Sequence, residues 1–98
     1  MPYTADVIEG LIDDGDRELS LVRKDFESRP IPPPAEEILD AVARGIDHRL
    51  MAARASLSVA RAEIDIKAVR EVGDEALIAL REVQGLVTMV LVAEAAMN

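Results

Sequence analysis

The only histidine, His48, and the arginines around it are the residues with side chains best suited to chemistry. Arg44 lies one helical turn before His48 and Ala52 one turn after it, so no carboxylate is placed nearby to orient the imidazole. Arg54 and Arg61 lie seven residues apart, on one face of a helix. Together with Arg44 and His48 they form a candidate anion or ligand site, which a second subunit would have to complete.

Metal and cofactor chemistry find little support elsewhere in the sequence. The acidic run Asp13–Glu18 lacks the ligand spacing of a calcium-binding EF-hand loop. The absence of cysteine excludes zinc ribbons, iron–sulfur clusters and thiol nucleophiles, and no Glu-x-x-His pair suited to a di-iron site is present. The sequence therefore predicts no catalytic residue, no metal and no cofactor, and the chain is not expected to be an enzyme. We interpret the acidic run as a surface for a basic partner.

Composition narrows the class of partner. The chain has 98 residues with a net charge of −8, and its bases form no cluster of the kind that nucleic-acid binding requires. The longest apolar run, 86–93, is shorter than the roughly 20 residues that cross a bilayer, and no basic signal-peptide region begins the chain. We expect a cytoplasmic protein that binds neither nucleic acid nor membrane.

A proline-rich break organises the chain. Residues 30–34 read Pro-Ile-Pro-Pro-Pro, and proline both lacks a backbone donor and disfavours a helix before it. We therefore expect an amphipathic acidic helix in 1–29, a connector at 30–34, and a long helical hairpin in 35–98 that forms the oligomerisation core.

Three apolar stripes with helical spacing predict an all-α fold. The first comprises Ile8, Ile12, Gly15, Leu19, Val22 and Phe26; the second Leu39, Val42, Ile46, Leu50, Ala53, Leu57, Ala60 and Ile64; and the third Val69, Val72, Ala76, Ala79, Val83, Leu86, Val90, Ala93 and Met97. The third alternates steps of three and four, as in a coiled coil. We expect an antiparallel helical hairpin or three-helix bundle with long, coiled-coil-like helices that dimerises.

The position of the turn after the prolines is less well defined. Gly73-Asp74 resembles a glycine C-cap followed by an aspartate N-cap, and the serines in 55–58 offer a second capping position. An unbroken helix over 34–97 would be about 96 Å long. Because compactness favours a hairpin over such a rod, we expect a turn near 73–74.

The C-terminal part of the chain has apolar residues outside the third stripe as well as within it. Leu77, Ile78, Leu80, Val87, Met89, Leu91 and Val92 add further faces to it. A helix apolar nearly all round needs burial on most sides, and two other helices cannot supply it. We therefore expect self-association, with an oligomer interface formed by Ala76, Leu80, Val83, Leu86, Val87, Val90 and Leu91.

Two short stretches resemble known helical families. Arg44-Gly-Ile-Asp47-His-Arg-Leu50, with Arg61 further on, resembles the opening helix of the small helical chorismate mutases, but too few residues follow to supply that family's remaining helices. Residues 31–50, IPPPAEEILDAVARGIDHRL, resemble the proline-to-helix entry of TraM-type antiactivators. Those are small all-α dimers that sequester a transcription factor.

The leading interpretation is a small acidic, helical, homo-oligomeric module that binds another protein, as a regulator, adaptor or assembly chaperone. One alternative is a helical-bundle enzyme or anion-binding protein, chorismate-mutase-like, with its site completed across subunits. Another is a structural subunit of a larger assembly.

Overall fold

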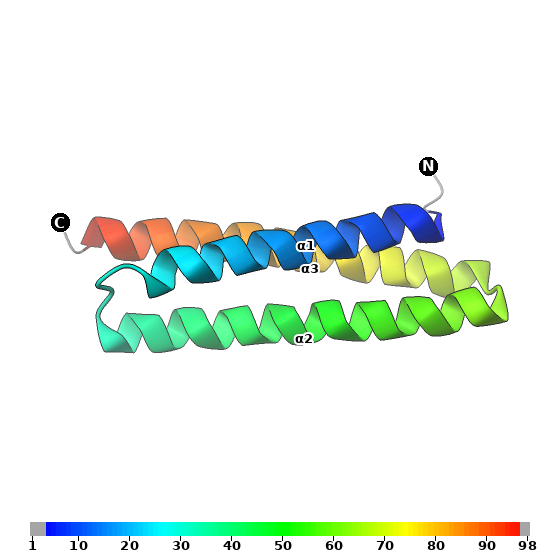
Figure 1. Ribbon diagram of the computed structural model, residues 1–98, viewed down its shortest axis with the longest axis horizontal. Coiled ribbons are helices and arrows are strands. Elements are labelled where there is room, and N and C mark those ends of the chain that lie inside the picture. Colours follow the sequence, from blue (N-terminus) through cyan, green and yellow to red (C-terminus); the bar gives the residue numbers. More distant parts are fainter. Residues whose placement is uncertain (1–3, 97–98) are drawn as a thin grey trace.

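A computed structural model describes residues 4–96 of the chain as three helices: α1 (Ala5–Glu27), α2 (Pro33–Glu63) and α3 (Ile66–Ala96). The helices lie side by side in one elongated bundle of 51 × 22 × 16 Å, in which α2 runs antiparallel to α1 and α3 (Figure 1). The expected all-α three-helix arrangement is thus confirmed, and a single rod over 34–97 is excluded.

The first helix follows its predicted stripe closely. Ile8, Ile12, Leu19 and Phe26 are buried, as is Gly15, so the apolar side of α1 faces the other two helices. The hydroxyl of Thr4 accepts a hydrogen bond from the backbone N–H of Val7 at 3.2 Å, which satisfies one of the free donors at the helix start.

The connector is shorter than predicted because α2 begins at Pro33 rather than after Pro34. Proline suits the first helical turn, where its missing N–H has no hydrogen bond to lose. Ile31 lies between exposed prolines and is buried in the core. This side chain anchors the connector to the bundle, a role that the sequence pattern did not reveal.

The turn between the last two helices lies at Ile64-Asp65, so our prediction near Gly73-Asp74 is wrong, and residues 55–58 also lie within a helix. Ile64 ends α2 in the left-handed conformation, with φ of 55°. The carboxylate of Asp65 then accepts a hydrogen bond from the N–H of Ala68 at 3.1 Å and caps α3. Gly73 is buried within α3.

Replacing Ile64 by glycine is expected to raise the free energy of unfolding by about 1 kcal/mol, because a β-branched residue is strained in the left-handed region. The Ile64 side chain is 85% exposed, so little packing is lost. Urea denaturation measures the difference. The matched control is Ile66→Gly, which removes another exposed isoleucine at the first residue of α3, where φ is not positive, and should cost up to about 0.5 kcal/mol instead. A loss of stability in both variants would contradict this reading of the turn.

Aliphatic side chains from all three helices form one core. Most members of the second and third stripes are buried, whereas Ile64 is exposed at the turn and Met97 lies outside the described residues. Among residues 4–96, no buried side chain of the core is polar or charged. The third stripe of the sequence is therefore used inside the single chain.

Candidate interaction surfaces

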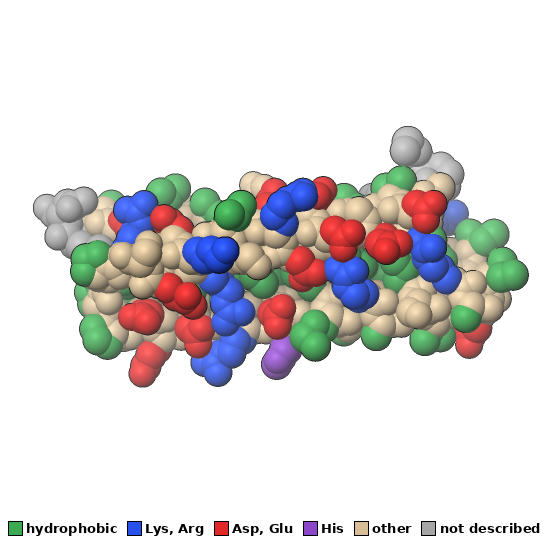
Figure 2. Space-filling view, in the orientation of Figure 1, with side chains coloured by type: hydrophobic (Ala, Val, Ile, Leu, Met, Phe, Trp, Pro, Cys, Tyr) green, Lys and Arg blue, Asp and Glu red, His purple; other side chains and the backbone are tan. Residues whose placement is uncertain are grey.

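A ladder of ion pairs joins α1 to α2. The guanidinium of Arg54 contacts Asp13 at 2.9 Å and Asp16 at 2.6 Å. One heptad further along α2, Arg61 repeats the arrangement with Asp6 at 2.8 Å and Glu9 at 2.9 Å. Charged side chains gather along this side of the bundle (Figure 2).

The ladder changes the interpretation of the acidic run in α1. The hydrogen bonds that Arg54 donates to Asp13 and Asp16 raise the pKa of Arg54, which therefore stays charged at any ordinary pH. Asp14 pairs with Arg17 within α1. The acids that we expected to attract a basic partner are thus largely paired inside the molecule.

The candidate anion site is not assembled within one chain. Arg44 pairs with Asp40 at 2.8 Å, and His48 is exposed on α2. Arg54 and Arg61 are engaged by the carboxylates of α1, and about 26 Å of helix separates residue 44 from residue 61. Within residues 4–96, no group of three or more His, Cys, Asp or Glu side chains is placed to hold a metal ion.

The predicted oligomer interface divides into two groups. Ala76, Val83, Leu86 and Val90 are buried in the core of the single chain, so their side chains offer no exposed surface to a second copy, and their place in an oligomer interface stays a prediction. Leu80 is half-buried, whereas Val87 is 39% exposed and Leu91 59% exposed. The apolar stripe of α3 packs against α1 and α2, so only the side chains beside this stripe are exposed for contact with a partner.

The flank of α3 next to α1 carries an apolar surface, which we call the α1–α3 face. A hollow of about 180 Å³ is lined by Leu21, Val22, Asp25, Val87, Val90 and Leu91. A second hollow of about 410 Å³ is lined by Asp14, Glu18, Leu77, Leu80, Arg81 and Gln84. Side chains from both helices border each hollow, and Leu21 and Leu91 leave large aliphatic surfaces in solvent.

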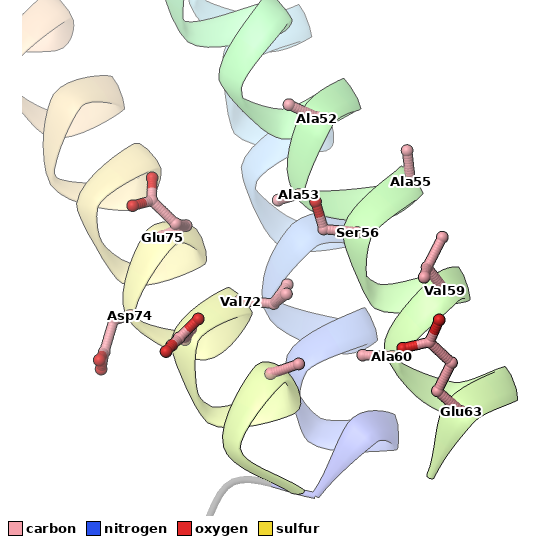
Figure 3. A pocket seen from close by; sticks show the side chains of 12 residues that line it. Ala52, Ala53, Ala55, Ser56, Val59, Ala60, Glu63, Val72, Asp74 and Glu75 are labelled. Atoms are coloured by element: carbon pink, nitrogen blue, oxygen red, sulfur yellow. The ribbon is translucent and has the colours of Figure 1, made fainter. Parts of the chain in front are cut away.

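The flank of α3 next to α2 carries a larger hollow near the α2–α3 turn, which we call the α2–α3 groove. It encloses about 830 Å³ and is lined by Ala52, Ala53, Ala55, Ser56, Val59, Ala60, Glu63, Ala68, Glu71, Val72, Asp74 and Glu75. Small side chains of α2 form one wall, with Val72 and acidic residues on α3 opposite (Figure 3). This groove was not expected from the sequence, although its alanines and acids recur there at helical spacing.

By length and composition α3 also qualifies as a helix that could cross a membrane. The apolar run 86–93, which only Thr88 interrupts, is too short to suggest this. Only 28% of the apolar window in α3 is buried within the bundle. Core helices of soluble proteins satisfy the same test, so this property describes the apolar surplus of α3 rather than its surroundings.

Comparison with known proteins identified no relative of this chain. No protein family, no curated protein sequence and no solved structure matches the chain. The argument for function therefore rests on the surfaces of the bundle.

Proposed function

We propose that the chain is a helical protein–protein interaction module, acting as a regulator, adaptor or assembly chaperone rather than as an enzyme. In this proposal it self-associates through the α1–α3 face and leaves other surfaces for a partner protein. The observation that carries the proposal is the contrast between the three sides of the bundle. The ion pairs of Arg54 and Arg61 line the α1–α2 side. Ion pairs also reach α3 from Arg49 and Arg29, but exposed aliphatic side chains and hollows lie on both flanks of that helix.

The α1–α3 face has the properties of a surface that becomes buried on association. Leu21, Val87 and Leu91 are large aliphatic residues exposed around one hollow. Contiguous exposed apolar patches on a folded chain mark sites of protein interaction. A two-fold axis would place the same patch of each copy opposite the other, which is the commonest arrangement of homo-oligomers.

Placing charge on this face tests the proposal. The double substitution Val87→Asp with Leu91→Asp is expected to weaken dimerisation about 100-fold, because central apolar contacts carry most of the binding energy of an interface. Sedimentation velocity measures the mass, and circular dichroism confirms that the helices are retained. The control is Met51→Asp, which alters an exposed aliphatic residue on α2 outside all of the hollows. Equal masses for the double variant and the control would contradict the proposed face.

A further inference from the structure

We propose that the α2–α3 groove binds an amphipathic helix with basic flanks, supplied by another protein. This inference rests on the proposed interaction function and names the chemistry of its partner. It concerns a different side of α3 from the face assigned to self-association, so the two assignments can fail separately.

The shape of the groove suits a short helix. Its lining residues on α2 run from Ala52 to Glu63, which corresponds to about 17 Å along the axis, or three turns of a guest helix. Alanine and serine side chains are too small to fill the space between the two backbones, and the hollow therefore stays open. Val59 stands at its edge with 57% of its surface exposed. Larger aliphatic side chains from a partner would fill this space and cover Val59.

The charges around the groove select a basic partner. Glu63 lies on the α2 wall and Glu71, Asp74 and Glu75 lie on α3, and none of the lining residues is a lysine or arginine. Glu75 is paired with Arg49 at 3.0 Å. In the part of the chain that the structure describes, no ion pair engages Glu63, Glu71 or Asp74, in contrast to the acids of the α1–α2 ladder.

The shape and the charge of the groove together indicate the kind of helix that it binds. An amphipathic helix inserts apolar residues spaced i, i+3, i+4 and i+7 into a groove, and lysine or arginine beside this stripe would meet the acids on both walls. A second copy seated groove to groove is a poor occupant because the lining residues of both grooves include acids and no lysine or arginine. The two acidic surfaces would repel each other.

A designed peptide provides the probe: 14 residues of leucine and lysine, with the leucines on one helical face and the lysines on both sides of it. Its affinity for the full chain is measured by fluorescence anisotropy at 150 mM salt. Ser56→Leu places a larger side chain in the groove and is expected to weaken binding at least tenfold. Ala41→Leu adds the same bulk to an exposed position of α2 outside the groove and should leave the affinity within twofold.

Charge reversal distinguishes binding at the groove from attraction of a basic peptide by the overall negative charge of the chain. Glu63→Lys with Glu71→Lys is expected to weaken peptide binding about tenfold. The control, Glu27→Lys with Glu37→Lys, changes the net charge equally and also alters the last residue of a helix, but lies outside the groove. It should weaken binding less than threefold. Equal losses of affinity in the two charge-reversal variants would overturn the proposal, and so would equal affinities of Ser56→Leu and Ala41→Leu. A lower mass of the Ser56→Leu chain without peptide would also overturn it, because that result identifies a second copy as the occupant of the groove.

The same titration distinguishes this inference from the proposed self-association. If the peptide binds the Val87→Asp, Leu91→Asp variant as it binds the unmodified chain, the groove is supported whatever the mass of the protein. If the chain dimerises but the peptide does not bind, the groove assignment is overturned while the α1–α3 face is retained.

Discussion

Replacing Leu86 by alanine is expected to lower the free energy of unfolding by about 3 kcal/mol, a large part of the 5–15 kcal/mol typical of a domain. Leu86 is 0% exposed and belongs to the core shared by the three helices. Its truncation removes the transfer free energy of the side chain and leaves a cavity that the long helices can close only in part. Urea denaturation followed by circular dichroism measures the change.

Leu91→Ala is the matched comparison, since it makes the same substitution on the same helix at a side chain that remains 59% exposed. Under dilute conditions that favour the monomer, it should change the stability by no more than about 0.5 kcal/mol. Similar costs for the two variants would contradict the assignment of Leu86 to the core and of Leu91 to an outer face.

Enlarging Gly15 to leucine is expected to destabilise the bundle by about 2 kcal/mol through overpacking. Gly15 is buried in α1, and a Cβ atom there would lie 2.9 Å from the Cδ2 atom of Leu50 and 3.7 Å from that of Leu80. The end of Leu50 can shift to admit a methyl group, but a whole leucine must displace both neighbours. Thermal or urea unfolding measures the loss.

Gly10→Leu on the same helix tests whether packing is the cause. A Cβ atom at Gly10 meets nothing within 4 Å, so this substitution should raise stability by about 0.5–1 kcal/mol through the higher helix propensity of leucine. Destabilisation of similar size at both positions would contradict overpacking against Leu50 as the cause at Gly15.

The sequence was sufficient to predict the helices and most of the core, because burial along a helix repeats with its 3.6-residue period. It did not locate the turn. Gly73-Asp74 has the chemistry of a cap, yet the unbroken apolar phase from Val72 to Ala76 carries a helix through it. The actual turn uses Ile64 in a conformation that isoleucine rarely adopts, so the aspartate N-cap at Asp65 lacks the preceding glycine that usually marks the end of a helix.

The surfaces were only partly predictable for a different physical reason. An apolar stripe shows that a side chain is buried, but not whether its neighbour belongs to the same chain or to another. Leu86 and Leu91 therefore both looked like interface residues, and only the packing of three helices separates them. The partners of Arg54 likewise depend on the register of α2 against α1, although the heptad step from Arg54 to Arg61 signalled a shared face.

The central claim is that the flanks of α3 are surfaces for protein association. Multi-angle light scattering of the unmodified chain, across a concentration series, tests it most directly. We expect a mass twice the 10.6 kDa of the chain that falls towards 10.6 kDa on dilution. A mass of 10.6 kDa at every concentration would contradict self-association through the α1–α3 face.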